Sequence, residues 1–208
     1  MRTAYLLGVP LAWAVLLLFH PNPDPGDVYG SLHHEVDRWL AVHLGTLVFI
    51  GLLGAAVFVL LDGCAGTAAR ISRVGAGVFV LLYGAGEAIL GVAVGVLVRH
   101  GDQAGAQVLW DDFVTDDLVV TVGAIGWVVA VLAAAVALRQ AGGPLAASVL
   151  VAASAIVVLH GPPVGPLGLV LFAAGVAIGS PRPPGPRSPT SPAEPPWPGR
   201  PSAASPGC

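Results

Sequence analysis

Long apolar stretches dominate the first 180 residues of the chain, and short polar segments separate them. A helix needs about 20 apolar residues to cross the roughly 30 Å hydrocarbon layer of a bilayer. The pattern therefore predicts an all-α fold, a polytopic membrane helix bundle formed by residues 1–180. Six transmembrane helices are expected, over about Thr3 to Phe19, Trp39 to Leu61, Val74 to Val98, Leu118 to Leu138, Pro144 to Leu159, and Val164 to Gly179.

The last two stretches are shorter than the others. Each has about 16 residues, which corresponds to about 24 Å at 1.5 Å per residue, less than the hydrocarbon thickness. Two interpretations remain open, a pair of short spans or a re-entrant hairpin. If both helices are short spans, the turn between them lies below the outer surface and places His160 inside the bundle.

The segment 181–208 has a different composition, because 11 of its 28 residues are proline. Such a segment favours an extended, polyproline-like conformation over a packed one. We expect a disordered cytoplasmic tail.

Composition and charge support the membrane class and set its orientation. Hydrophobic residues make up 55% of the chain and charged residues 10%, against about 25% charged residues in a soluble domain. Arginine concentrates in cytoplasmic loops, so both termini are expected in the cytoplasm. This orientation puts most of the arginines inside: Arg2, Arg70, Arg73, Arg139, Arg182, Arg187 and Arg200.

The abundance of Ala, Gly, Val and Pro is typical of a high-GC bacterial genome, and the expected location is therefore the bacterial plasma membrane. The bilayer is the first expected partner. A second membrane protein or another copy of the chain is a further candidate, and no nucleic-acid partner is expected.

All six histidines fall on the outer side of this topology. His20 closes the first span, His43 lies about one turn inside the second, and His160 ends the fifth. Histidine is a common ligand of metals and of haem iron, so these three are candidate metal ligands, with a divalent metal or haem as the cofactor. His33, His34 and His100 are interpreted as polar rings at the membrane interface.

Glu87 is the most unusual residue of the predicted spans. It lies about 12 residues, or about 18 Å, inward from Arg99, near the middle of the bilayer. A carboxylate at that depth costs at least about 2.5 kcal/mol and is expected to face the bundle interior. Tyr83, one turn earlier, is a candidate hydroxyl partner. Thr46, Asp117 and Thr121 are further candidates for ligand binding or proton handling in the same interior.

Small residues accompany Glu87 along its helix. Gly77, Gly84, Ala88, Gly91 and Gly95 form a stripe that would let a neighbouring helix approach closely. In the preceding span, Ser31 is expected to cap the helix, and Trp39 and His43 would share one face because they are four residues apart.

The combination of "HP" after the first span, "WLAVHLG", "YGAGEAILGVAVG" and "HGPPVGPLG" resembles small multi-pass membrane proteins of actinobacteria that carry no established activity. The resemblance covers residues 1–180 and excludes the tail. It implies a six-helix bundle and no particular chemistry.

Three functions are compatible with these residues. The first is a protein whose outward-facing polar pocket, with Glu87 and Tyr83 as its floor and His20, His43 and His160 at its rim, binds a metal ion, haem or a small ligand. The second is a proton-coupled transporter or channel component in which Glu87 titrates. The third is a structural or assembly subunit of a membrane complex. An enzyme is the least favoured class, because no nucleophile and base can be paired and no Walker loop, dinucleotide motif or haem-attachment motif occurs.

Overall fold

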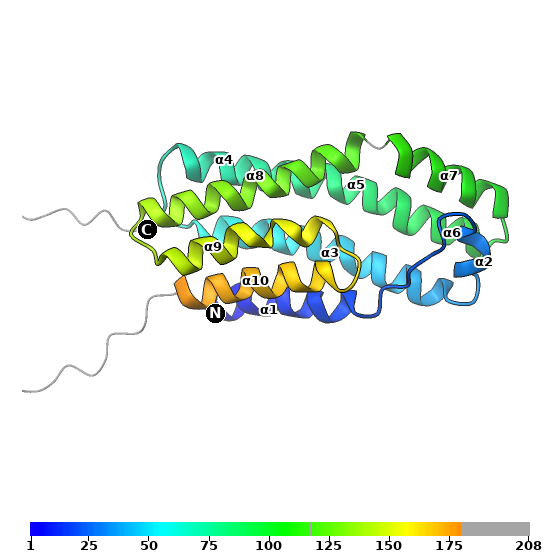
Figure 1. Cartoon of the computed structure of the whole chain (residues 1–208), viewed down its shortest axis with the longest axis horizontal. Coiled ribbons are helices and arrows are strands. Elements are labelled where there is room, and N and C mark those ends of the chain that lie inside the picture. The colour runs from blue at the N-terminus through cyan, green and yellow to red at the C-terminus, as the bar shows by residue number, and fades with distance from the viewer. Residues whose placement is uncertain (117, 180–208) are drawn as a thin grey trace, which may run out of the picture.

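The computed structural model describes residues 1–116 and 118–179, and every regular element in these ranges is helical (Figure 1). The elements are α1 (Arg2–Leu17), α2 (Val28–Leu32), α3 (Val36–Leu60), α4 (Thr67–Val78), η1 (Phe79–Tyr83), α5 (Gly84–Glu87), η2 (Ala88–Ala93), α6 (Val94–Arg99), α7 (Gln103–Asp116), α8 (Leu118–Gln140), α9 (Leu145–Ala153), η3 (Ser154–Val158) and α10 (Val164–Gly179). The predicted all-α class is confirmed. The predicted tail at 181–208 and the candidate Asp117 lie outside the described residues.

Three helices are long and apolar enough to cross a membrane, namely α3, the continuous run Thr67–Arg99 and α8. Their lengths are about 37, 50 and 35 Å. Three further apolar helices are shorter: α1, the run Leu145–Val158 and α10. The second predicted span agrees with α3 to within three residues. The run Thr67–Arg99 begins seven residues before the predicted Val74, because a polar helical turn with Arg70 and Arg73 precedes its apolar part.

The six apolar helices pack as a closed ring. α1 contacts α3 and α10, α3 contacts the run from α4 to α6, α4 contacts α8, α8 contacts α9, and α9 contacts α10. α1 begins and α10 ends at the same end of the molecule, whereas α2, α6 and α7 lie at the opposite end (Figure 1). Glycines in the left-handed conformation end two of the long helices, Gly101 after α6 (φ +77°) and Gly142 after α8 (φ +81°).

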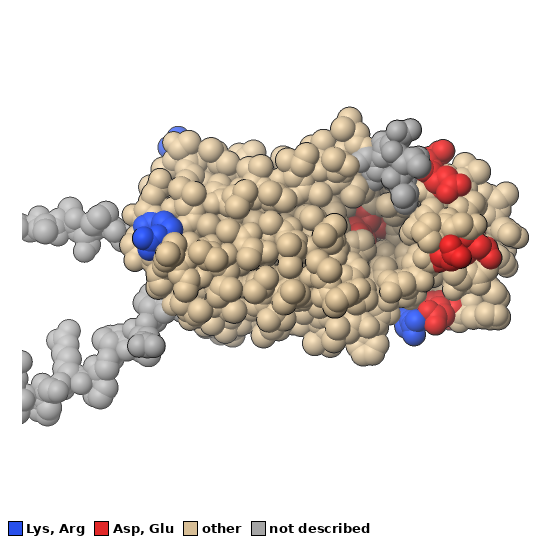
Figure 2. Space-filling view, in the orientation of Figure 1, with Lys and Arg blue, Asp and Glu red and all other residues tan. Residues whose placement is uncertain are grey.

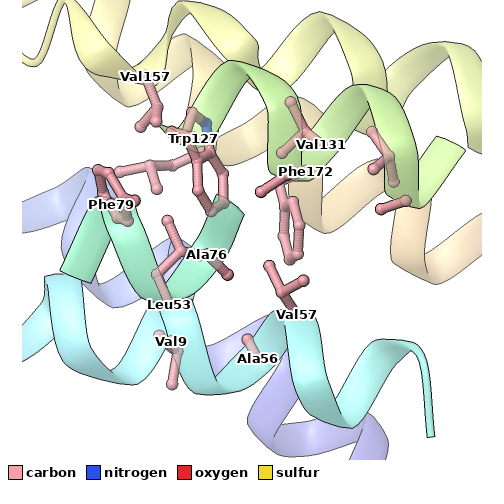
Figure 3. Packing of buried hydrophobic residues seen from close by; sticks show 14 of the residues in the cluster. Val9, Leu53, Ala56, Val57, Ala76, Phe79, Trp127, Val131, Val157 and Phe172 are labelled. Atoms are coloured by element: carbon pink, nitrogen blue, oxygen red, sulfur yellow. The ribbon is translucent and has the colours of Figure 1, made fainter. Parts of the chain in front are cut away.

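Aromatic side chains fill the centre of this ring. The Trp127 ring on α8 lies 5.0 Å from that of Phe79 and 6.0 Å from that of Phe172, measured between centroids. Aliphatic residues of α1, α3 and η3 surround them, including Val9, Leu53 and Val157 (Figure 3). The Trp127 indole N–H donates to the Ser154 carbonyl at 3.1 Å, so the one polar atom of this ring is satisfied.

The run from α4 to η1 meets α8 backbone to backbone. A Cβ atom at Gly75 would lie 2.7 Å from the Gly126 carbonyl oxygen, and one at Gly126 would lie 2.9 Å from the Phe79 nitrogen. Ser72 adds a hydrogen bond, because its hydroxyl donates to the Ala130 carbonyl at 2.7 Å. We call this contact the α4–α8 seam. Small residues thus allow close helix approach here, as they do between many membrane helices.

A second, smaller core forms beyond the ring. The start of α3, α6, α2 and α7 enclose it, and its buried members are Val28, Leu32, Trp39, Leu40, Val94, Val98 and Ala106. Gln107 connects α7 to the loop before α2 by accepting from the Val28 N–H and donating to the Pro25 carbonyl. α2 and α7 were not predicted, since α2 is too short and α7 too polar to be a span.

The helical start of the second span also differs from the prediction. Ser31 lies inside α2, whose N-cap is Asp27, and α3 begins later with Glu35 at its N-cap. The Asp27 carboxylate accepts from the Gly30 N–H at 2.8 Å. The expected Ser31 cap is therefore wrong, because the chain forms a separate short helix before α3.

The shorter apolar helices end partway along the longer ones, and we call the level at which they end the step. α1, the run Leu145–Val158 and α10 end or begin near the point where α3 and the run Thr67–Arg99 continue into the smaller core (Figure 1). His20 follows α1, and His160 lies in the turn between η3 and α10. The two chain segments that carry these histidines thus end against the flanks of longer helices.

Candidate metal centre

Three histidines from separate segments come together at this step. His20 lies just after α1, His43 is two turns into α3, and His160 lies in the turn that follows η3. One potential ligand atom from each residue can be chosen so that all of them lie within 4.8 Å of one another. The structure therefore brings together all three predicted metal candidates.

The three rings are in direct contact. The ring centroid of His20 lies 4.9 Å from that of His43 and 5.0 Å from that of His160, and the last two are 6.2 Å apart. Two of the three pairs have edge-to-face geometry.

Glu87 completes the group from the long helical run. Its Oε1 lies 3.4 Å from Nδ1 of His160, and its Oε2 lies 3.8 Å from Nε2 of His43. The residue is only 6% exposed and is the one acidic residue among the buried residues of the described chain. We call His20, His43, His160 and Glu87 the histidine cluster.

Two short π-helical segments flank Glu87, η1 before it and η2 after it. π-helical turns are rare and often occur at functional sites. Each one changes the direction in which the following residues point. Both segments lie in the helical run that carries Glu87, Tyr83 and Gly91.

His43 is held in place by Trp39 and Gly91. Its Nδ1 lies 2.9 Å from the Trp39 carbonyl oxygen, so Nδ1 carries the proton and Nε2 is the nitrogen directed at Glu87. The Trp39 indole N–H donates to the Gly91 carbonyl in η2 at 2.6 Å. The His43 ring occupies the position that a Cβ atom at Gly91 would take. A fixed hydrogen bond to the second ring nitrogen is the usual way in which proteins orient a metal-binding histidine.

Trp39 was not among the predicted site residues. The only available signal was its spacing of four residues before His43, which put both on one helix face. The centroids of the Trp39 and His43 rings lie 3.9 Å apart. The Trp39 ring also meets the His20 ring edge-on, with a centroid distance of 5.3 Å.

Tyr83 contacts the cluster through His160. Its hydroxyl lies 2.9 Å from both the Val158 carbonyl oxygen and Nδ1 of His160. The O–H donates to the Val158 carbonyl, and the Tyr83 oxygen then accepts from His160 Nδ1–H, which leaves Nε2 of His160 as a free electron-pair donor. The hydroxyl was expected to pair with Glu87, and its hydrogen bonds instead orient one of the histidines.

The polar atoms of the cluster fit a bound cation. Among the described residues, both ring nitrogens of His20 and Oε2 of Glu87 are buried without a hydrogen-bond partner. An unsatisfied buried polar atom costs about 1–3 kcal/mol, and few such atoms are tolerated in a native protein. Nitrogen and carboxylate donors are the ligands that divalent zinc, copper and iron prefer.

The surface of the molecule is hollowed near this region. Figure 2 shows a depression between the apolar body and the end that carries most of the acidic side chains, with acidic atoms visible inside it. His43 is almost fully buried, whereas His160 keeps 25% of its side chain exposed. Access to the cluster is therefore from the side of His160.

The other sequence candidates lie elsewhere. Thr46 is buried one turn below His43, where its hydroxyl oxygen accepts from the Trp13 indole N–H at 3.3 Å. Thr121 is exposed on α8, so it does not belong to the buried cluster. His33, His34 and His100 are exposed near the smaller core. Asp117 is not among the residues that the structure describes.

Fold and site together define an all-helical protein with three helices long and apolar enough to span a membrane and a histidine cluster compatible with metal binding. Comparisons with protein-family models, with curated proteins and with solved structures give no match for this chain.

Proposed function

We propose that this protein is a multi-pass membrane protein that binds a divalent transition-metal ion through His20, His43, His160 and Glu87. One observation carries the proposal. Three imidazoles from different parts of the chain offer ligand atoms within 4.8 Å of one another. The buried Glu87 carboxylate lies beside two of these rings, 3.8 Å from Nε2 of His43 and 3.4 Å from Nδ1 of His160.

The proposed topology has six spans with both termini in the cytoplasm of a bacterium and the cluster toward the outer side. Support comes from the charges, because acidic side chains gather at the end opposite to the start of α1 (Figure 2). The arginines of that end, Arg38 and Arg99, are each paired with an acidic residue. Arg2 and Arg73 both donate to carbonyls at the end of α3, those of Val59 and Leu61. α10 lies along α1, which has the same length of 16 residues, and this favours two short spans over a re-entrant hairpin.

A metal ion suits the cluster better than haem. A haem iron takes at most two protein ligands, whereas three imidazoles here offer ligand atoms within 4.8 Å of one another. Zinc bound to imidazole has a metal–nitrogen distance of about 2.0–2.1 Å, so donors around one ion lie about 3.4 Å apart. The ligand atoms of the three imidazoles lie within 4.8 Å of one another in the structure, so metal binding would draw them closer together.

The residues of the histidine cluster and their neighbours would have different roles in holding such an ion. His20, His43 and His160 supply neutral nitrogen donors, and the Glu87 carboxylate supplies a negative charge that offsets part of the charge of the ion. Trp39 and Tyr83 fix the rings of His43 and His160 through hydrogen bonds. A nitrogen-rich set of four donors favours zinc, copper or iron over magnesium or calcium, which prefer oxygen ligands.

Elemental analysis of detergent-purified protein without a polyhistidine tag tests the proposal. The wild-type protein is expected to carry about one zinc, copper or iron ion per chain, either as purified or after incubation with each metal. A His43→Ala, His160→Ala double variant should lose it, because two of the four donors are removed.

The matched control is a His33→Ala, His34→Ala double variant, which removes the same number of histidines from the exposed part of the chain. It should retain the metal. The proposal is wrong if wild-type protein takes up no metal under any of these conditions, or if both double variants bind it equally. In the first case, proton handling by Glu87 becomes the leading function.

A further inference from the structure

A second candidate site lies at the other end of the ring, between α8 and α9. The helices leave a recess of about 290 Å³, lined by Ala135, Val136, Arg139 and Gln140 of α8 and by Ser148, Val149 and Ala152 of α9. The recess exists because alanines stand on both helices where larger side chains would close it. We infer that this recess binds one acyl chain of an anionic phospholipid whose phosphate pairs with Arg139.

The apolar walls of the recess favour an acyl chain as the bound group. Its walls are apolar, and Val136 and Val149 on its two flanks are exposed in the described structure. Exposed valines on membrane-spanning helices face hydrocarbon. The recess extends over little more than one helical turn on each side, which is too short for a neighbouring helix, since helices pack along several turns. A flexible acyl chain has no such requirement.

Arg139 favours a lipid with an anionic phosphate headgroup. It lies in the last turn of α8, where the arginine stem can line apolar surface while the guanidinium reaches the polar interface. One guanidinium nitrogen, Nη1, donates to the Gly143 carbonyl, which anchors the side chain in the loop after α8. Arginine pairs with phosphate through two parallel hydrogen bonds. Among the residues that line the recess, Arg139 is the one with a charge.

This inference does not depend on the metal, because the recess and the histidine cluster are formed by different segments. It requires only that the ends of α8 and α9 lie in a bilayer. The headgroup would sit at the end at which α1 begins, where basic side chains are visible without acidic ones beside them (Figure 2).

Native mass spectrometry of delipidated protein is the direct test. Phosphatidylglycerol and phosphatidylcholine with identical acyl chains are added in equal amounts in detergent. Wild-type protein should retain one phosphatidylglycerol with at least tenfold preference. Arg139→Gln should lose the preference, Arg139→Lys should keep part of it, and Ala152→Phe should retain neither lipid because the ring fills the recess.

Two controls separate this site from general lipid adhesion. Arg70→Gln removes an exposed arginine that does not line the recess, and Ala153→Phe adds the same ring to an exposed position of the same helix. Both should behave as wild type. Equal retention of the two lipids by wild-type protein, or an unchanged preference in Arg139→Gln, would overturn the inference. Arg139→Gln keeps the test decisive if Ala152→Phe folds poorly.

Discussion

The α4–α8 seam and the histidine cluster are both built around glycines of the run Thr67–Arg99, and they bury polar groups in opposite ways. In the seam, Gly75 and Gly126 bring two backbones together, and the one buried hydroxyl, that of Ser72, donates to a carbonyl. In the cluster, Gly91 makes room for the His43 ring, and three polar atoms have no partner within the described chain.

The comparison distinguishes a close contact that only packs two helices from one that belongs to a binding site. A glycine at a close contact is the same signal in both places, so glycine alone does not identify a site. What differs is whether the polar atoms near the close contact are satisfied. Ser72, Ser154 and Trp127 all find backbone carbonyls, as expected where helix association is the only task. His20 and Glu87 do not, as expected where a ligand supplies the missing partner.

Gly91→Ala should have the largest effect on the cluster. The added methyl group occupies the space of the His43 ring, so the ring must leave its hydrogen bond to Trp39. We expect a loss of metal affinity of about 100-fold, the upper range for disturbing the groups that orient a ligand. Isothermal titration with zinc measures it. Gly77→Ala on the same run, where a Cβ atom meets nothing within 4 Å, is the control and should bind as wild type. Equal affinities for both variants would show that Gly91 does not position His43.

Gly126→Ala tests the seam in the same way. Its methyl group would lie 2.9 Å from the Phe79 nitrogen, and a backbone atom cannot move aside as a side chain can. Overpacking of this kind costs about 1–3 kcal/mol, so we expect a lower free energy of unfolding in detergent and an unchanged metal affinity of the folded protein. Gly51→Ala on α3, with open space around its Cβ position, should not be destabilised. A metal-binding defect in Gly126→Ala would mean that the two regions are coupled.

The sequence predicted which histidines lie at the same level of the bundle better than it predicted their contacts. Counting along an apolar helix places a residue at a level in the bilayer, and this put His20, His43 and His160 on one side and identified Glu87 as unusual. It does not give the angle around the helix axis. Thr121 was therefore expected inside and is exposed on α8.

The remaining features of the site depend on which helices lie next to each other, and a pattern along the sequence does not give this. The roles of Trp39 and Gly91 become visible only when α3 lies against η2, and the π-helical turns that flank Glu87 have no simple sequence pattern. The predicted stripe likewise divides between environments: Gly91 and Gly95 meet α3 side chains, whereas Gly77 faces open space. α2 and α7 have no strong pattern of their own, because α2 has only five residues and α7 mixes apolar with acidic residues.

Glu87→Gln should produce effects of opposite sign on binding and on stability. Replacing the carboxylate removes a charged ligand, so zinc affinity should fall about tenfold. The metal-free protein should become more stable by about 1 kcal/mol, because an uncharged amide costs less to bury than a carboxylate without a partner. Thermal unfolding with and without zinc measures both. A variant that is less stable without metal would show that Glu87 has a structural role like that of Ser72.

Ser72→Ala should have the smallest effect and completes the contrast. The variant removes a donor whose loss leaves the Ala130 carbonyl in its ordinary helical hydrogen bond, so no atom becomes newly unsatisfied. Interhelical hydrogen bonds of this kind contribute about 0.6 kcal/mol on average in membrane proteins, and we expect a decrease of that size in the free energy of unfolding. Zinc affinity should stay the same. Ser72→Gly, which loses the same hydroxyl and also the Cβ contact, should be destabilised further. If Ser72→Ala weakened metal binding as strongly as Glu87→Gln, paired and unpaired polar groups would be equivalent here, and the unsatisfied atoms of the cluster would no longer indicate a ligand site.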